Sequence, residues 1–177
     1  FSRTRYTYDL KGQLTQVLDA AGNVTAIEYD QMGRKIQLID PDMGTWQYGY
    51  DAAGNLSWQR DSLGQTIQFN YDSLHRLTAK LAGSTMLASY GYDAQEGGNA
   101  GIGRRTSMTA HGSGVNNSAT FHYDIYGQLL AEQRTIDGRQ FDFHYEYTDG
   151  GLPSATYYPG TAHTAPAGWQ YGEKVVT

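Results

Sequence analysis

The chain has 177 residues, a net charge of −5, 22 glycines, 15 tyrosines and no cysteine. The aromatic content argues against disorder, because disordered segments contain few aromatic residues. The absence of cysteine excludes disulfides and thiolate metal sites. The sequence contains no run of about 18 apolar residues, so a membrane-spanning helix is not predicted. It also contains no cluster of basic residues, which argues against nucleic-acid binding. Many glycines and aromatics, with few long aliphatic side chains, favour an all-β protein with many tight turns.

A tyrosine–aspartate pair recurs along the chain at a constant step of 21 residues. The first five copies begin at Tyr8, Tyr29, Tyr50, Tyr71 and Tyr92. In most copies a glycine stands three places after the aspartate. The residues that define the repeat are Tyr8, Asp9, Gly12, Tyr29, Asp30, Gly33, Tyr50, Asp51, Gly54, Tyr71, Asp72, Tyr92, Asp93, Tyr123, Asp124 and Gly127. A fixed period of this size predicts a repeat architecture.

The later copies are spaced more widely and are less complete. The step from Tyr92 to Tyr123 is 31 residues, and Tyr147 and Tyr171 follow at steps of 24 without the aspartate. A second aromatic stands two residues before the tyrosine in every copy except the one with Ile27. These aromatics are Tyr6, Tyr48, Phe69, Tyr90, Phe121, Tyr145 and Trp169. The pattern therefore predicts eight full or degraded copies.

Each copy contains two segments of extended character and two turns. In chain order the first such segments are residues 6–8, 14–18, 24–29, 45–50 and 65–71. They are rich in Thr, Val, Ile, Tyr, Phe and Trp, which fit a pleated surface, and short Asp/Gly turns separate them. This predicts tandem ~21-residue β-hairpins in one curved antiparallel sheet. Alternation places both aromatics of a copy on one face, without telling which face that is.

The aspartates and glycines of the pattern are predicted to form turns. An aspartate side chain can accept a hydrogen bond from the backbone two residues on, and a glycine supplies positive φ at no steric cost. His75 stands in the glycine place, where we expect positive φ because histidine is among the residue types that tolerate it. The segment from Asp40 to Gly44 is interpreted as another plain turn.

Two insertions interrupt the later repeats. Residues 94–102 and 111–117 are glycine-rich and are predicted to be surface loops, the kind of segment that can carry function. A third exposed loop is expected over residues 161–168. The whole chain, 1–177, is interpreted as one repeat region, regular over 5–92, interrupted over 93–158 and degenerate over 159–177.

No catalytic, metal or cofactor site is predicted. His122 and His144 could be neighbours on adjacent units, but two histidines without a positioned carboxylate make a weak metal site. Motifs for a serine nucleophile, a zinc protease or a phosphate-binding loop are absent from the sequence.

The quoted pattern resembles the Rhs/YD-repeat family, which is named for this tyrosine–aspartate unit. The resemblance rests on residues 29–36 and 40–56, and it covers residues 5–158 clearly. It implies a large protein, secreted or delivered to the cell exterior. Bacterial Rhs polymorphic toxins, the B and C components of insecticidal toxin complexes and animal teneurins are such proteins. The sequence of residues 40–45 looks more like that of the bacterial members.

The resemblance further implies that the repeats coil a β-sheet into a hollow shell around a toxin domain. The expected function is therefore structural: a shell segment that encapsulates and protects a toxin or other cargo. The expected partners are further YD repeats of a longer parent chain and the enclosed toxin domain. The alternative is a binding module whose tyrosine-rich sheet holds carbohydrate or a receptor. As an isolated fragment, the chain is expected to form a homodimer or higher association through its unpaired sheet edges.

Overall fold

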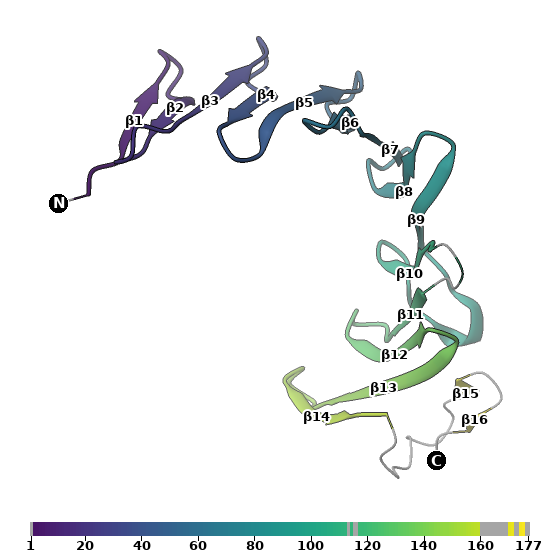
Figure 1. Ribbon diagram of the computed structural model, residues 1–177. Coiled ribbons are helices and arrows are strands. Elements are labelled where there is room, and N and C mark those ends of the chain that lie inside the picture. The colour runs from purple at the N-terminus through teal and green to yellow at the C-terminus, as the bar shows by residue number, and fades with distance from the viewer. Residues whose placement is uncertain (1, 113, 115–116, 160–169, 172–173, 176–177) are drawn as a thin grey trace. The chain divides into compact units, whose positions relative to one another are not determined.

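The computed structural model describes residues 2–112, 114, 117–159, 170–171 and 174–175, and it is all-β apart from one short 3-10 helix. The chain divides into two compact units, Phe1–Thr85 and Met86–Thr177. Within each unit, strands that are consecutive in the sequence lie side by side and antiparallel (Figure 1). The prediction of an all-β protein made of consecutive antiparallel hairpins is confirmed.

The first unit contains four complete hairpins. Its strands are β1 (Arg5–Tyr8), β2 (Leu14–Leu18), β3 (Val24–Tyr29), β4 (Lys35–Asp40), β5 (Gly44–Tyr50), β6 (Leu56–Arg60), β7 (Thr66–Tyr71) and β8 (Leu77–Ala82). Tyr8, Tyr29, Tyr50 and Tyr71 end β1, β3, β5 and β7 respectively. The four tyrosines therefore hold matched places, as the constant step predicts.

The second unit continues the pattern with longer connections. Its strands are β9 (Thr85–Tyr92), β10 (Arg105–Ala110), β11 (Asn117–Tyr123), β12 (Leu129–Ile136), β13 (Arg139–Tyr147) and β14 (Pro153–Tyr157), with a 3-10 helix at Glu96–Gly98. A separate two-stranded sheet pairs β15 (Gln170–Tyr171) with β16 (Lys174–Val175). The degraded eighth copy at Tyr171 thus belongs to that small sheet, and Trp169 and the loop predicted at 161–168 lie outside the described residues.

The two faces of the first unit differ in chemistry. Ladder pairs such as Ile27 with Leu38 and Leu38 with Trp46 place apolar residues on the face that also bears the aromatics two places before each repeat tyrosine. We call this the aromatic face. The opposite face presents Gln37 paired with Gln47, together with other polar side chains. The repeat tyrosines share the aromatic face, because they stand two residues from those aromatics.

The sheet has almost no buried core. Among the described residues, the only apolar side chains in the buried class are Ala79, Ala119 and Ala131, and no large side chain is fully buried. Backbone ladders and cross-strand side-chain pairs, each contributing about 0.2–1 kcal/mol, therefore stabilise the fold. No helix in the described part of the chain is long and apolar enough to cross a membrane.

A β-bulge occurs at the same place in every hairpin that is closed by a tyrosine–aspartate turn, and also in the β13–β14 hairpin, where Thr148 replaces the aspartate. In the first hairpin Thr7 pairs with Gln16 but Tyr8 pairs with Leu14, so Thr15 is the extra residue. The corresponding extra residues in the later hairpins are Ile36, Ser57, Thr78, Thr106, Leu130 and Ser154. A bulge bends the strand and increases its twist locally, so each hairpin bends at its turn end.

The insertion at 94–102 has a structural role. The backbone N–H of Asp93 donates to Arg104 at 3.1 Å, which is the bond that closes the ordinary turns, so the insertion lies within an enlarged turn. The side chain of Asn99 donates to the carbonyl oxygen of Phe121 and accepts from the N–H of Tyr123. Asn99 thus supplies β11 with hydrogen bonds of the kind a neighbouring strand would make. Of the second insertion, part lies outside the described residues; His111 donates its N–H to Leu87 at 2.8 Å.

Candidate functional site: the row of tyrosine–aspartate turns

The aspartate of each repeat organises its turn through several hydrogen bonds. Asp30 Oδ1 accepts from the N–H groups of Met32 and Arg34, both at 2.9 Å. The N–H of Asp30 donates to the Arg34 carbonyl at 2.9 Å, and the N–H of Gly33 donates to the Asp30 carbonyl at 3.0 Å. The same arrangement recurs at Asp9, Asp51, Asp72 and Asp124. The prediction that these aspartates form turns is confirmed.

The hydrogen bonds favour the ionised form of the carboxylates. The pKa of Asp51 is lowered, first by the side-chain hydrogen bond from Asn55 and then by backbone N–H groups. The pKa of Asp30 and the pKa of Asp72 are lowered mainly by the backbone N–H of the residue four places on. These carboxylates therefore act as ionised turn acceptors at neutral pH.

The glycine place has positive φ even where glycine is replaced. Gly54 has φ of 89° and His75 has φ of 62°, so the prediction for His75 is confirmed. The seventh copy keeps the turn although it lacks the aspartate. Thr148 Oγ1 accepts from the N–H of Leu152 at 3.2 Å, and Gly151 stands in the glycine place.

Within each unit, every repeat tyrosine after the first links its own hairpin to the preceding one. The hydroxyl of Tyr29, at the end of β3, donates to the carbonyl of Leu14, the first residue of β2, at 3.0 Å. Tyr50 donates to Lys35 at 2.8 Å and Tyr71 to Leu56 at 3.0 Å. In the second unit Tyr123 donates to Arg105 at 2.9 Å and Tyr147 to Leu129 at 3.0 Å. The acceptor is in each case the first residue of the strand that follows the preceding turn.

A second link joins successive turns directly. The residue whose carbonyl accepts the N–H of the repeat aspartate is here called the turn-linking residue; it stands four places after the aspartate in the regular turns and is Arg104 in the enlarged turn. Within each unit its side chain extends over the glycine place of the next turn. Gln13 Nε2 donates to the Gly33 carbonyl at 3.1 Å, and a Cβ atom on Gly33 would lie 2.9 Å from that nitrogen. The glycine therefore does more than permit positive φ: its missing side chain leaves space for the neighbouring amide.

The turn-linking residues have the same place in the other pairs of turns within each unit. Arg34 lies against Gly54, Arg104 against Gly127, and Gln128 against Gly151. The pair with His75 differs, because Asn55 Nδ2 lies 3.0 Å from His75 Nδ1. The shorter asparagine side chain leaves room for an imidazole where glycine is missing.

Arginine adds charge to these links. The guanidinium of Arg34 binds Asp30 Oδ2 at 2.7 Å in its own turn and lies 4.6 Å from the ring centroid of Tyr50 in the next hairpin. An aromatic face attracts a guanidinium at this distance through its quadrupole. One side chain thus connects the aspartate of one repeat with the tyrosine of the next.

Further cations lie on rings of the aromatic face. Lys35 Nζ is 4.3 Å from the ring centroid of Tyr48. In the second unit, the Arg105 guanidinium lies 5.9 Å from Tyr90 and 5.4 Å from Phe121. These contacts tie neighbouring strands together where an aliphatic core is lacking.

A buried carboxylate stabilises the middle of the second unit. Glu132 is 6% exposed and accepts from Arg134 at 2.6 Å and from the Tyr145 hydroxyl at 3.4 Å. Burial, followed by the charge of Glu132, raises the pKa of Tyr145, so this phenol stays a donor at neutral pH.

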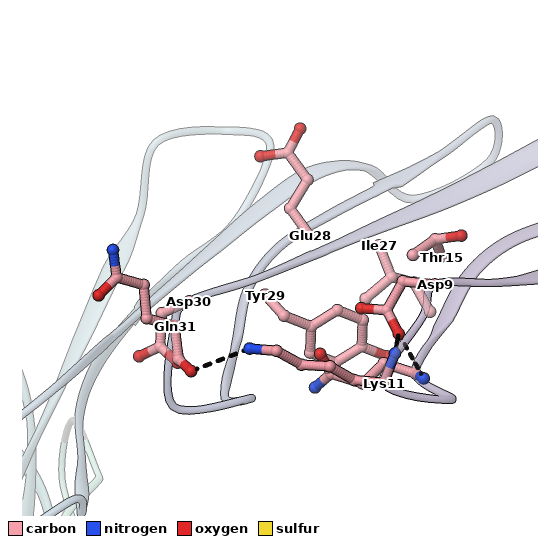
Figure 2. Close-up of a pocket in the computed structure, with 9 residues that line it drawn as sticks. Asp9, Lys11, Thr15, Ile27, Glu28, Tyr29, Asp30 and Gln31 are labelled. Carbon is pink, nitrogen blue, oxygen red and sulfur yellow. Dashed lines mark hydrogen bonds between the residues drawn. The ribbon is translucent and has the colours of Figure 1, made fainter.

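Equivalent shallow grooves lie between successive turns. One separates the turns of Asp9 and Asp30, and another separates those of Asp124 and Thr148. Figure 2 shows Lys11 crossing the first groove to the Gln31 carbonyl, 3.2 Å away, while Glu28 points away from Tyr29 and Lys11. The groove is thus bridged by side chains that join the two turns.

The histidines that were considered for metal binding lie on β11 and β13, on either side of β12. His122 and His144 both pair with Ala131, one from each neighbouring strand, so β12 separates them. No group of three or more His, Asp or Glu suitable for a metal ion occurs in the part of the chain that the structure describes.

Sequence reasoning identified the turn residues but missed the residues that connect the turns. The tyrosine hydroxyl acceptors, the bulges and the turn-linking residues were not predicted. A signal for the turn-linking residues was present, because the place four residues after the aspartate carries Gln13, Arg34, Asn55, Arg76 and Gln128, all long or amide side chains.

Known structures with this fold belong to much larger chains. The crystal structure of TcdB2-TccC3-Cdc42 is 19% identical with a TM-score of 0.63, and the match covers 90% of this chain and 9% of that chain. TcdB2-TccC3-TEV is 14% identical with a TM-score of 0.66, covering 89% of this chain and 9% of that chain. TcdB2-TccC3 without the hypervariable C-terminal region is 19% identical with a TM-score of 0.63, and the match covers 90% of this chain and 9% of that chain. The present chain therefore spans about a tenth of the structures it matches.

The sequence comparison agrees with the repeat chemistry. A comparison with curated proteins gives no match. Residues 2–99, more than half of the chain, match the family described as Teneurin YD-shell. That segment contains the four regular turns, the hydroxyl bonds of Tyr29, Tyr50 and Tyr71, and the beginning of the fifth repeat. The chain belongs to the Teneurin YD-shell family.

Proposed function

We propose that this chain is a wall segment of a bacterial protein shell that encloses and protects a toxin or other cargo polypeptide. The observation that carries the proposal is the pair of links, tyrosine hydroxyl and turn-linking residue, that joins each hairpin to the next within each unit. These links hold neighbouring hairpins together without a second layer of structure.

A wall needs this kind of cohesion. A sheet with almost no buried core would otherwise depend on its backbone ladder alone, and an isolated hairpin is only marginally stable in water. Here a hairpin gains at its turn end one hydroxyl bond to the previous hairpin and one polar contact to the next turn. The number of links grows with the number of repeats, so a wall of any length can be assembled from the same parts.

The comparisons support the same proposal. The matching family is named for a shell, and the similar structures combine TcdB2 with TccC3, one of them without a hypervariable C-terminal region. We infer that the parent protein is delivered to the cell exterior and that this segment contributes structure rather than catalysis. No contact of the described residues favours carbohydrate or receptor binding over this role.

Limited proteolysis of the parent protein tests the proposal. Inside an intact shell, the cargo should survive a protease that degrades the same cargo when it is produced alone. The double substitution Tyr50→Ala and Tyr71→Ala removes the hydroxyl bonds that join two successive pairs of hairpins, and it should make the cargo accessible to the protease. Tyr6→Ala is the matched control, because Tyr6 is 58% exposed and its hydroxyl has no hydrogen bond among the described residues. Cargo degraded equally fast in the intact protein and alone would contradict the proposal.

A further inference from the structure

The side chain of Asn99 fills a gap in the backbone ladder of the second unit. Asn99 Nδ2 donates to the Phe121 carbonyl at 2.8 Å, and Asn99 Oδ1 accepts from the N–H of Tyr123 at 2.9 Å. The N–H of the next residue, Ala100, donates to the Tyr123 carbonyl at 3.0 Å. One side-chain amide and one peptide N–H therefore bind three backbone groups at the end of β11, beyond the last residue that pairs with β10.

The same gap recurs between successive hairpins within each unit. The ladder from one hairpin to the next ends three residues before the repeat tyrosine. The last pairs are Gln16 with Ala26, Gln37 with Gln47, Trp58 with Gln68, Ser107 with Thr120 and Ala131 with His144. Beyond each of them the bulge of the earlier strand interrupts the pairing. The carbonyl two residues before the tyrosine, and the N–H and carbonyl of the tyrosine itself, therefore lie beyond the end of the ladder.

In the regular repeats these three backbone groups are open. The N–H of Asp30 donates to Arg34 on the β4 side, so the N–H of the preceding Tyr29 points to the β2 side, because neighbouring peptide groups of a strand alternate in direction. No ladder pair or side chain in the described part of the chain bonds there to the N–H of Tyr29 or to the Ile27 carbonyl. Figure 2 shows the groove at this place, with Ile27 and Tyr29 among the residues that line it.

The described residues offer no second occupant for these grooves. Asn99 stands in an insertion, whereas a regular turn has only two residues between the aspartate and the glycine place. Asn23 and Asn55 donate to the aspartates of their own turns. Asn117 accepts from the N–H of Asp137, in the turn after β12. An occupant from another polypeptide chain is therefore favoured.

We propose that the grooves before Tyr29, Tyr50 and Tyr71 are binding sites for an asparagine of another polypeptide, in a segment Asn–X in which X has a backbone N–H. The asparagine amide takes the place of Asn99, and the N–H of X takes the place of the Ala100 N–H. The inference concerns these grooves alone and does not rest on the enclosure of cargo.

The order of the backbone groups selects this ligand. The groove offers an acceptor, a donor and a second acceptor, and a carboxamide carries a donor and an acceptor on separate atoms. An ionised carboxylate can only accept and an ammonium group can only donate, so neither binds the first two groups together. Lys11 crosses the groove before Tyr29 and has to give way, whereas Met32, at the same place in the next groove, has no group to donate.

NMR titration of the ¹⁵N-labelled 1–177 chain tests the proposal. The probe is the peptide N-acetyl-Gly-Asn-Ala-amide, which has the sequence of residues 98–100. We expect saturable shifts of the backbone amide signals of Tyr29, Tyr50 and Tyr71. The matched peptide N-acetyl-Gly-Asp-Ala-amide lacks the donor and should bind about tenfold more weakly, the effect of one lost hydrogen bond.

The fifth groove supplies an internal control. The Tyr123 amide should not respond to the asparagine peptide in the unaltered chain, because Asn99 already occupies its groove. In Asn99→Ala it should respond as Tyr29 does. The proposal is overturned if the amides of Tyr29, Tyr50 and Tyr71 do not shift, or if the aspartate peptide shifts them at the same concentration. Neither result would bear on the protection of cargo, which proteolysis measures separately.

Discussion

A repeat tyrosine connects three strands at once. The backbone of Tyr50 pairs forward with Leu56 of β6, while its hydroxyl reaches back to Lys35 of β4. Its ring also receives the Arg34 guanidinium. Phenylalanine lacks the hydroxyl and aliphatic residues lack the π face, so neither could make all three contacts.

Removal of this hydroxyl should therefore be measurable. Tyr50→Phe keeps the ring but leaves the Lys35 carbonyl without its donor, so we expect the free energy of unfolding to fall by about 0.5–1.5 kcal/mol. Tyr6→Phe, which removes an exposed hydroxyl of the same sheet, should change it by less than about 0.5 kcal/mol. Urea titrations of both variants at one pH measure the difference. Equal losses would show that the Tyr50 hydroxyl bond contributes nothing specific.

The glycine place imposes a second requirement at single-residue scale. Gly54 has φ of 89°, a conformation that a β-branched residue adopts only with strain. Gly54→Val should therefore destabilise by about 1–3 kcal/mol. Ala53→Val, one residue earlier in the same exposed turn, should cost much less. Thermal unfolding compares the two, and equal shifts in Tm would count against the turn geometry.

At the scale of the turn, the aspartates make stability depend on pH. The pKa values of Asp30, Asp51 and Asp72 are lowered in the folded state, so the unfolded chain binds these protons more tightly. The stabilisation is therefore complete above the ordinary carboxylate value of 3.8 and is lost as the pH falls through the lowered folded value.

Asp51→Asn should make the free energy of unfolding lower at neutral pH and less dependent on pH in the acidic range. Asp42→Asn is the control, because Asp42 contributes its backbone N–H to the turn, as a donor to Asp40 Oδ1, and not its carboxylate. Denaturant titrations between about pH 2 and pH 6 measure both slopes. An unchanged slope in Asp51→Asn would show that the Asp51 carboxylate does not carry the effect.

Neighbouring turns should also behave as matched pairs. The Asn55 side chain contacts His75, whereas Gln13 lies over Gly33 and Arg34 over Gly54. The double substitution Asn55→Gln and His75→Gly recreates the pairing of Gln13 with Gly33. Its free energy of unfolding should exceed the additive expectation from the two single variants by about 0.5–3 kcal/mol. A double-mutant cycle with additive effects would refute the matching.

The sequence contains enough information for the order of the elements but not for their contacts. Strand segments and turns follow from the constant step, and the strand ends at Tyr8, Tyr29 and Tyr50 lie where the pattern predicts. The extra residue at Thr15 could not be predicted, because threonine suits a regular strand and a bulge equally well. The carbonyl that accepts each tyrosine hydroxyl depends on the strand register set by the bulge, so it could not be predicted either.

The insertion at 94–102 illustrates the same limit. Its glycines predict a loop. Nothing in the sequence indicates that the Asn99 side chain donates to the Phe121 carbonyl and accepts from the Tyr123 N–H in β11. Asparagine carries a donor and an acceptor in one amide, so it can replace a backbone peptide of an adjacent strand. The hydrogen bonds of Asn99 to β11 cannot be predicted until the fold places this loop beside that strand.

At the scale of the whole molecule, the fold depends on repetition rather than on a core. With three alanines as its buried apolar residues in the described part, the sheet is stabilised by links that each repeat makes with its neighbours. Such an assembly gains from every additional repeat, and its outermost strands present unpaired backbone groups. Self-association of the isolated chain stays a prediction that light scattering can test.

The central claim, that this chain is a wall segment around a cargo, is tested most directly by electron cryo-microscopy of the parent protein. The account predicts that residues 5–157 form part of a continuous wall, with density for non-repeat polypeptide on the enclosed side. A map in which these repeats form a free surface module, with solvent on both faces of the sheet, would contradict it.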